Sequence, residues 1–538
     1  MTALALVRDA DFIDVAGLRA HLNAASRPEP YPAGSGESSL KVLTCGSVDD
    51  GKSTLIGRLL WDTDGLPVDQ RARIERSPRT PAGTHDFSLL VDGLVAEREQ
   101  GITIDVAWRY LDAGSRRLVI IDSPGHTQYT RNMATGASHA DVAILLVDAR
   151  SGIKEQTRRH AALLDLMGVR RVVLAVNKMD LAAWSEARFT AIRMEFEQIA
   201  ARFGFLDALA VPVSAVLGDN VASRSESAPW YNGPSLLQHL DVIPSRALDD
   251  AREFRFPVQL VVRSGQDFRG LAGTLASGSI GIGDEVTEPI SGRRARVNRI
   301  VTMDRDLERA HHGQAIVLEL DTDLDISRGA VLACTDQSPA VTRSIDVRMV
   351  WLSDEPLATQ RGYLLRTATD LVPITGVRLN ALLDLATLAE RPASVCAAND
   401  IAIARLDLGR SAAVDLFAEH PTTGSFILVD PVSGASVAGG VITATGSPKN
   451  AAGSGAFRLT RAVLANGVGA DLPPNGRDAD EELRRRANEV AILLRAAGVT
   501  VDLEDGWART GIDPAAIMSW LMAIGSFGFV GAVLLGFV

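Results

Sequence analysis

A strand–loop–helix motif constrains the fold of this chain more than any other feature. The apolar run LKVLTC (residues 40–45) leads into GSVDDGKS (residues 46–53), and the helical pattern TLIGRLLW follows. This is the G-x-x-x-x-G-K-[ST] pattern in its strand–loop–helix setting, which predicts a phosphate-binding loop in an α/β domain. Its glycines let backbone N–H groups face a phosphate, and the helix N-terminus adds partial positive charge. We expect Lys52 to reach the β- and γ-phosphates of a nucleotide and the Ser53 hydroxyl to bind Mg²⁺.

Two acidic residues inside this loop, Asp49 and Asp50, are unusual beside a polyanion. Such side chains either fix the shape of the loop or contact a partner, or they point outward into solvent. The sequence leaves these alternatives open for Asp50.

The surrounding sequence divides into regions with different periodicities. Short apolar runs such as RLVIID, DVAILLVDA and RRVVLAVNK alternate with helical patterns, which predicts a mostly parallel α/β domain over residues 39–245. Beyond Phe254, β-like runs such as FPVQLVVRS are broken by Gly turns, and we expect two β-barrels over residues 250–342 and 343–445. We expect residues 1–38 to be an N-terminal leader and linker, and residues 446–538 to be a tail of uncertain structure.

Two further segments indicate that the nucleotide is GTP. Asn177-Lys178-Met179-Asp180 follows an apolar strand, where ligands bind in open α/β sheets. A carboxylate at Asp180 can accept hydrogen bonds from N1–H and the N2 amino group of guanine, a donor pair that adenine lacks. We expect Asn177 to tie this segment to the phosphate loop and the Lys178 stem to cover the base. A backbone N–H of Ser214-Ala215 is then placed to reach guanine O6.

Two other segments supply candidate groups for the metal and for water. Asp122-Ser123-Pro124-Gly125-His126 ends the run RLVIID. We expect Asp122 to hold Mg²⁺ through a water, the Gly125 N–H to sense the γ-phosphate and His126 to orient the attacking water. In REQGITID (residues 98–105), Thr103 can bind both Mg²⁺ and the γ-phosphate, contacts that hydrolysis would release, as in a switch.

Composition limits the surroundings in which the chain acts. The formal net charge is −11, which argues against a surface that binds nucleic acid or anionic lipid throughout. Three widely spaced cysteines make neither a zinc pattern nor a disulfide framework, and acids interrupt the short apolar run at the N-terminus. We therefore expect a cytoplasmic protein without a signal peptide.

The motif order GSVDDGKS, REQGITID, DSPGH, NKMD and SA resembles the translation-factor class of GTPases, such as elongation factor Tu. Within that class, residues 38–445 are similar to the large, GTP-hydrolysing subunit of bacterial heterodimeric sulfate adenylyltransferase. Translation factors usually have His where Asp50 stands, and GKT where this chain has GKS. The family often has DTPGH where this chain has DSPGH, and Ser123 keeps the hydroxyl.

This resemblance implies a G domain followed by two β-barrels. It also implies a small partner subunit that joins ATP and sulfate into adenosine 5′-phosphosulfate and pyrophosphate, driven by GTP hydrolysis on this chain. The implied Mg²⁺ ligands are Ser53, Thr103 and Asp122, and the implied catalytic residues are His126, Lys52 and Thr103. The candidate GTP-binding residues are Gly46, Ser47, Val48, Asp49, Asp50, Gly51, Lys52, Ser53, Thr54, Asp122, Gly125, His126, Asn177, Lys178, Asp180, Ser214 and Ala215.

Alternatives to this assignment remain. One is a translation-factor-like or regulatory GTPase without sulfate chemistry. A fused, active adenylylsulfate kinase is excluded, because the tail has one lysine, Lys449, and no second phosphate loop. A decayed remnant of such a kinase is still an alternative for the tail. The uncharged end, residues 514–538, is long enough to be a membrane anchor but is more simply a helix that docks on protein, since the expected substrates are soluble.

Overall fold

The computed structural model describes residues 39–63, 66, 68–76, 85–91, 103, 105–113, 116–244, 252–264, 268–446, 457–459, 485 and 501–503. The predicted leader and the apolar end lie outside these residues, as do residues 98–102 and 104 of the predicted switch. The chain forms two compact units, Met1–Gly446 and Ser447–Val538.

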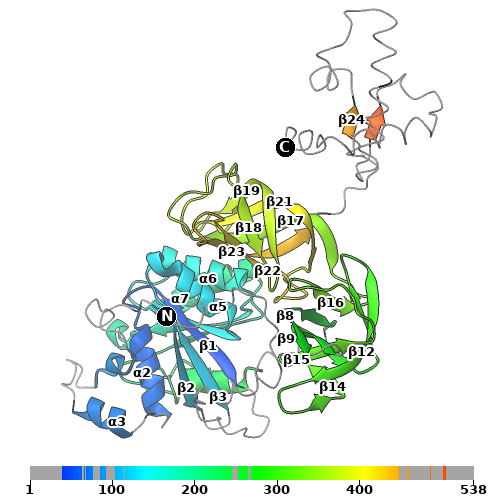
Figure 1. The fold of residues 1–538 in the computed structure, drawn as a ribbon. Helices are drawn as coiled ribbons and strands as arrows, with labels where there is room; N and C mark the ends of the chain where they lie inside the picture. Colours follow the sequence, from blue (N-terminus) through cyan, green and yellow to red (C-terminus); the bar gives the residue numbers. More distant parts are fainter. Residues whose placement is uncertain are drawn as a thin grey trace, which may run out of the picture. The chain divides into compact units, whose positions relative to one another are not determined.

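The first part of the larger unit is a six-stranded sheet in the order β2-β3-β1-β4-β5-β6 (Figure 1). Strand β1 (Leu40–Gly46) lies between β3 (Arg117–Asp122) and β4 (Val142–Asp148), and both pairings are parallel. The parallel order continues through β5 (Arg171–Asn177) and β6 (Asp207–Pro212), whereas β2 (Ala107–Asp112) is an antiparallel edge strand. All seven residues of β4 are buried, as its uninterrupted apolar sequence predicts for a strand covered on both faces.

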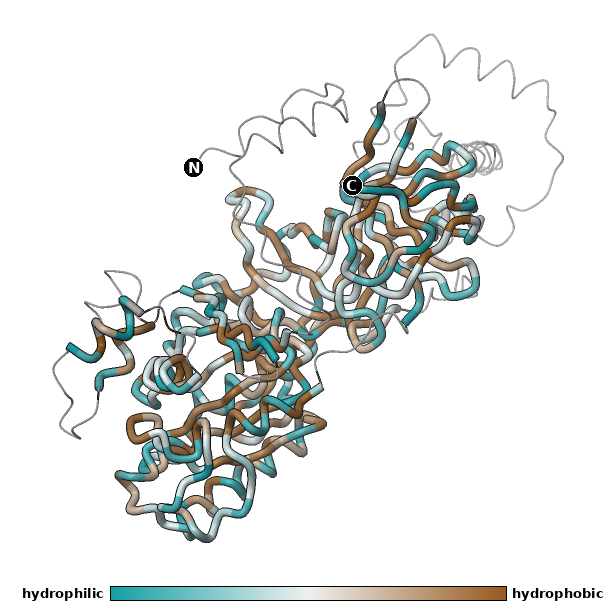
Figure 2. The backbone as a smooth tube through the Cα atoms, turned by 90° about the horizontal axis from the view of Figure 1, so that it is seen from below, coloured by the Kyte–Doolittle hydropathy of each residue, from teal (hydrophilic) through white to brown (hydrophobic). Residues whose placement is uncertain are grey.

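Helices connect these strands and cover the sheet. The α-helices are α2 (Lys52–Asp62), α3 (Val68–Glu75), α5 (Thr130–Ser138), α6 (Glu155–Leu166), α7 (Glu186–Phe203) and α8 (Leu236–Val242). Short 3-10 helices are η1 (Phe87–Leu90), η2 (Thr127–Tyr129) and η3 (Met179–Ala182). Brown, hydrophobic segments run through the interior of the packed elements in Figure 2.

The next part is a curled antiparallel sheet in the order β7-β16-β11-β12-β15-β9-β8, with β13 paired to β12 and β10 paired to β14. Its strands are β7 (Arg255–Pro257), β8 (Leu260–Ser264), β9 (Phe268–Thr274), β10 (Ser279–Gly281), β11 (Glu285–Glu288), β12 (Arg293–Val301), β13 (Asp306–Leu307), β14 (Arg309–His311), β15 (Ala315–Leu320) and β16 (Val331–Cys334).

The run FPVQLVVRS, expected as one β segment, is divided between β7 and β8. The Val258 N–H donates to Ala330, beside β16, and the Gln259 N–H donates to Ala272 in β9. Strands β7 and β8 are the two edge strands of this sheet, and only Val258 and Gln259 separate them. The short connection brings the two edges together, as in a barrel.

The third part is a closed barrel. Its order is β18-β22-β23-β17-β21-β19, and β18 also pairs with β19, which completes the ring. Its strands are β17 (Ala340–Trp351), β18 (Tyr363–Arg366), β19 (Leu371–Leu383), β20 (Glu390–Arg391), β21 (Ile401–Val414), β22 (Ser425–Val429) and β23 (Ser436–Thr445). The predicted fold, an α/β domain followed by two β-barrels, is confirmed.

Polar contacts fix the three parts of this unit to one another. Arg255 of the first barrel and Asp415 of the second form a buried ion pair at 3.0 Å, both side chains being 4% exposed. Helices α5 and α6, in cyan in Figure 1, lie beside the second barrel. At the end of α6, the Asp165 carboxylate accepts from Arg348 of β17 at 2.9 Å.

In the smaller unit, the structure describes two short parallel strands, β24 (Phe457–Leu459) and β25 (Val501–Leu503). Among the described residues of the whole chain, no helix is both long enough and apolar enough to cross a bilayer.

Candidate functional site

The predicted site segments converge because each follows a strand of one parallel sheet. Gly46 ends β1, Asp122 ends β3 and Asn177 ends β5, while Ser214 follows β6. Parallel strands present their carboxyl ends at the same edge, which is where open α/β sheets bind ligands. The sheet order therefore brings together residues that are up to about 170 positions apart in the sequence.

The phosphate loop has a backbone that requires glycine at two positions. Gly46 has φ 151° and Gly51 has φ 96°, both in the region that favours glycine. A Cβ at Gly51 would lie 2.4 Å from Nδ2 of Asn177, so a side chain there would collide with the neighbouring loop. Val48 is half-buried and Asp49 is exposed, whereas Ser47 is buried, and its Oγ has no hydrogen-bond partner among the described residues.

Lys52 begins α2 and folds back over the loop. Its Nζ donates to the carbonyl oxygens of Gly46 at 3.0 Å and Ser47 at 2.9 Å. Burial lowers the pKa of Lys52, and the nearby carboxylates of Asp122 and Asp50 act in the opposite direction. The side chain thus lies in the middle of the loop, while Ser53 and Thr54 follow it as half-buried residues of the first helical turn.

The outward orientation that the sequence left open for Asp50 is wrong. Asp50 is 1% exposed, and its Oδ2 accepts from the Ser47 N–H at 2.8 Å inside the loop. Its Oδ1 accepts from Lys154 Nζ at 3.1 Å. The carboxylate can be buried because these two donors form hydrogen bonds to its charged oxygens. In an exposed loop position, water would take their place.

The segment after β3 packs directly on the phosphate loop. A Cβ at Gly125 would lie 2.3 Å from Lys52 Nζ and 2.6 Å from the Gly46 carbonyl oxygen, so only glycine fits there. The buried Asp122 carboxylate accepts from the Thr44 hydroxyl at 3.3 Å, and the Ser123 hydroxyl donates to the Thr44 carbonyl oxygen at 2.7 Å. The hydroxyl that the family resemblance retains at position 123 therefore joins β3 to β1.

His126 is half-buried at the start of η2. Its Nδ1 accepts from the Gln128 N–H at 3.3 Å, which caps the helix. Because Nδ1 supplies a lone pair to this bond, the neutral ring carries its proton on Nε2. The ring can therefore present an N–H donor to a ligand while it is uncharged.

Asn177 connects three loops of the site. Its Nδ2 donates to the Asp50 carbonyl oxygen at 2.8 Å, and its Oδ1 accepts from the Ala215 N–H at 3.0 Å. The Ala215 N–H is thus already bonded to Asn177, so a contact with guanine O6 would have to share or replace that bond. Ser214 is buried, and its Oγ accepts from the Leu217 N–H at 3.3 Å.

Lys178 adopts a left-handed backbone with φ 62°, and its Nζ lies 3.2 Å from Asp148 Oδ2. It also donates to the Asp49 carbonyl oxygen. Burial acts to raise the pKa of Asp148, but hydrogen bonds from Arg150 and Lys178 hold it well below its usual range. Asp180 is half-buried in η3, on the same loop.

Sequence reasoning missed a group of residues that support the site from α6 and the end of β4. Gln156 Nε2 donates to the Gly125 carbonyl oxygen at 3.3 Å and lies 2.9 Å from His160 Nε2. Burial lowers the pKa of His160 to about 3, and the charges of Lys52 and Arg159 act in the same direction. Asp148 and Lys154 also belong to this group, through their contacts with Lys178 and Asp50. None of these residues lies in a short motif that would identify it from the sequence.

The donor set fits a magnesium-bound nucleotide. Mg²⁺ prefers oxygen ligands and is usually bound by one or two carboxylates together with phosphates and water. The Asp122 carboxylate is buried near Lys52, and the Ser53 hydroxyl lies one residue further along α2. Thr103 is half-buried.

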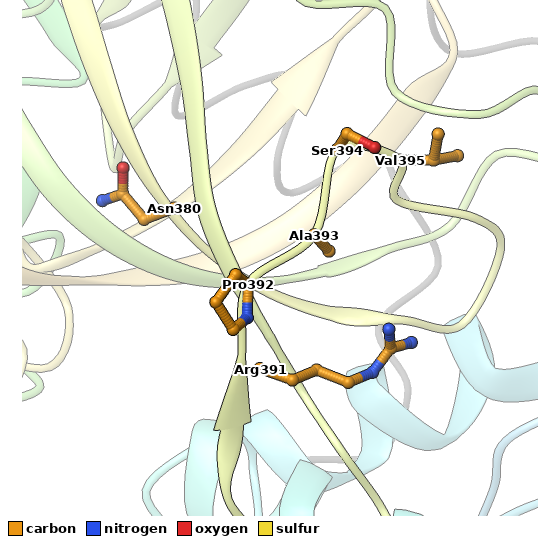
Figure 3. Close-up of a pocket in the computed structure, with 6 residues that line it drawn as sticks. All are labelled: Asn380, Arg391, Pro392, Ala393, Ser394 and Val395. Carbon is orange, nitrogen blue, oxygen red and sulfur yellow. The ribbon is translucent and has the colours of Figure 1, made fainter.

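A separate hollow lies on the second barrel (Figure 3). It is lined by Asn380, Arg391, Pro392, Ala393, Ser394 and Val395. None of the predicted site residues lines it, so it belongs to a different surface.

Two family models match the chain. The elongation factor Tu GTP-binding domain matches residues 37–251, and the GTP-eEF1A C-terminal domain-like family matches residues 344–443. The first match contains all the predicted site residues.

Named relatives narrow the family further. Sulfate adenylyltransferase subunit 1 of Methylorubrum extorquens is 47% identical over 462 residues, which are 85% of this chain and 95% of that protein. The same subunit of Laribacter hongkongensis is 48% identical over 75% of this chain and 85% of that protein. The bifunctional enzyme NodQ of Rhizobium is 47% identical over 76% of this chain, but the match spans 63% of NodQ. This chain therefore belongs to the family of sulfate adenylyltransferase subunit 1.

Proposed function

We propose that this chain is the GTP-hydrolysing subunit of a two-subunit sulfate adenylyltransferase. A small partner subunit joins ATP and sulfate into adenosine 5′-phosphosulfate and pyrophosphate, and this chain hydrolyses GTP to GDP and phosphate to drive that reaction. The identity of 47% over 95% of sulfate adenylyltransferase subunit 1 carries the proposal. The free cysteines Cys45, Cys334 and Cys396 are compatible with a cytoplasmic protein.

The phosphates of GTP bind around Lys52. Loop amides donate to the β-phosphate, and Nζ of Lys52 exchanges one of its two loop carbonyls for a phosphate oxygen. Ser53, Thr103 and Asp122 hold Mg²⁺, which neutralises phosphate charge when it is bound.

The guanine base is recognised by the loops after β5 and β6. Asp180 accepts from the N1–H and N2 amino group, and Lys178 covers one face of the base. Asn177 positions both loops through its bonds to Asp50 and Ala215. Adenine would leave the Asp180 carboxylate without its donors, and this explains a preference for GTP.

Hydrolysis takes place beside Gly125 and His126. The Gly125 N–H contacts the γ-phosphate, and the packing of Gly125 on Lys52 lets both respond to the same phosphate. His126 orients the attacking water through Nε2, because Nδ1 is used in the cap of η2.

Coupling requires that the partner subunit distinguish the GTP and GDP states of this chain. Formation of the phosphosulfate anhydride is strongly unfavourable, so the free energy must come from GTP hydrolysis. A nucleotide can transfer free energy only if the two states of this chain differ in their affinity for the partner or its intermediates.

Nucleotide hydrolysis by the purified chain tests the first half of this proposal. We expect hydrolysis of GTP in preference to ATP, and we expect Lys52→Ala to abolish nucleotide binding, because it removes the cation assigned to the β- and γ-phosphates. Unchanged GTP affinity in Lys52→Ala would contradict the assignment. Thermal melting of the variant serves as the folding control.

A further inference from the structure

The phosphate loop contains a buried acid whose charge is not used in the proposed reaction. Asp50 Oδ2 accepts from the Ser47 N–H at 2.8 Å, and Oδ1 accepts from Lys154 Nζ at 3.1 Å. The Asp50 carbonyl oxygen accepts from Asn177 Nδ2 at 2.8 Å. This residue therefore connects the loop to itself, to the base-recognition loop and to the residue that precedes α6.

A carboxylate in this position opposes the binding of a polyphosphate. Its Oδ2 accepts from the Ser47 N–H at 2.8 Å, and Lys52 Nζ donates to the carbonyl oxygen of the same residue at 2.9 Å, so the carboxylate is also close to the phosphates that Lys52 is expected to bind. A carboxylate and a phosphate that lie close together repel each other strongly where little solvent screens their charges. The Asp50 side chain is only 1% exposed, so screening by solvent is weak there. A neutralising cation is needed for the loop to keep this acid and still accept GTP.

Lys154 is placed to supply that cation. Lys154 lies outside the phosphate loop, and its side chain is 40% exposed. Among the described residues, the ion pair recorded for its ammonium group is with Asp50. Its backbone N–H has a different task, because it donates to Thr157 Oγ1 at 3.2 Å in the cap of α6. A substitution at this position can therefore remove the charge and leave the helix cap in place.

We propose that Lys154 is a positioning residue that increases the affinity of the phosphate loop for the nucleotide. It does so by neutralising the charge of Asp50, which would otherwise repel the phosphates. The inference rests on the proposed function, in that the loop must bind a guanine nucleotide. It assigns to Lys154 a role in nucleotide affinity that requires no contact with the nucleotide.

The test measures GDP affinity of Lys154→Met in two backgrounds, the native chain and Asp50→Asn. The asparagine substitution removes the charge at position 50 but retains an oxygen for the Ser47 N–H. Asp50→Ser is a second uncharged background should Asp50→Asn fold poorly. Lys154→Arg keeps the cation, and Arg193→Met removes a distant one, since Arg193 pairs with Glu197 on α7 at 3.6 Å.

We expect Lys154→Met to weaken GDP binding at least about fivefold more in the native background than in Asp50→Asn, since the two charges act as a coupled pair. Lys154→Arg and Arg193→Met should retain near-native affinity. A smaller difference between the two backgrounds would overturn the role of Lys154 while native GDP binding remained intact. Absence of guanine-nucleotide binding by the native chain would instead overturn the proposed function, and this inference with it.

Discussion

The proposed recognition of guanine depends on a single carboxylate, Asp180. In Asp180→Asn the side-chain amide can donate to the C2 oxygen of xanthine, which a carboxylate repels. We expect GTP binding to weaken roughly 10–100-fold, as for loss of a charged hydrogen bond, and xanthosine triphosphate binding to improve. Competition between the two nucleotides for the variant measures this directly. If xanthosine triphosphate binds no better to the variant than to the native chain, Asp180 does not recognise the base.

The proposed hydrolysis depends on a second residue, His126, whose Nδ1 accepts from the Gln128 N–H at the start of η2. We expect His126→Ala to leave GTP affinity nearly unchanged and to slow hydrolysis by roughly 10²–10⁴-fold, the range for loss of a positioned proton-transfer or water-orienting group. Single-turnover hydrolysis and equilibrium binding separate the two effects. A large loss of affinity would show that His126 holds the nucleotide and does not act on water.

At the scale of elements, α6 links the nucleotide site to the second barrel. Gln156 in its first turn donates to the Gly125 carbonyl oxygen, and Asp165 near its end pairs with Arg348 of β17. The helix therefore contacts both a turn that is expected to sense the γ-phosphate and a barrel outside the G domain.

The buried His160 of α6 makes stability depend on pH. Its pKa is about 3 in the folded chain, against about 6.5 when unfolded. Between these values the unfolded chain binds a proton that the folded chain does not, so the free energy of unfolding falls as pH decreases below about 6.5. For one such group the loss between pH 7.5 and 5.0 is about 2 kcal/mol.

We therefore expect the stability gap between the native chain and His160→Gln to narrow by about that amount over the same pH interval. Urea unfolding at the two pH values measures it, with His312→Gln as the control at an exposed position. An equal gap at both pH values would show that His160 is not held neutral by burial.

Local patterns in the sequence predicted the strands and the loops that follow them. Short apolar runs such as VAILLVD, which alternate with helical patterns, are typical of strands covered on both faces. The pairing of Lys154 with Asp50 was not predictable, since the two residues are 104 positions apart and no motif contains both. The division of FPVQLVVRS into β7 and β8 likewise depends on which neighbours bond to Val258 and Gln259.

At the scale of the whole molecule, the two barrels are joined by the buried pair of Arg255 and Asp415. Breaking a buried pair by removal of one partner typically costs about 3–5 kcal/mol, because the charge that remains is buried without compensation.

Pyrophosphate release from ATP and sulfate, measured with this chain and a co-expressed small subunit, tests whether GTP hydrolysis on this chain drives adenylyl transfer. We expect GTP to increase product formation in the native complex, and we expect His126→Ala to bind GTP but lose that increase, because hydrolysis supplies the driving free energy. If GTP still increased product formation fully in His126→Ala without being hydrolysed, GTP would act only as an allosteric ligand. Equal pyrophosphate release with and without GTP in the native complex would contradict a role of this chain in driving the reaction.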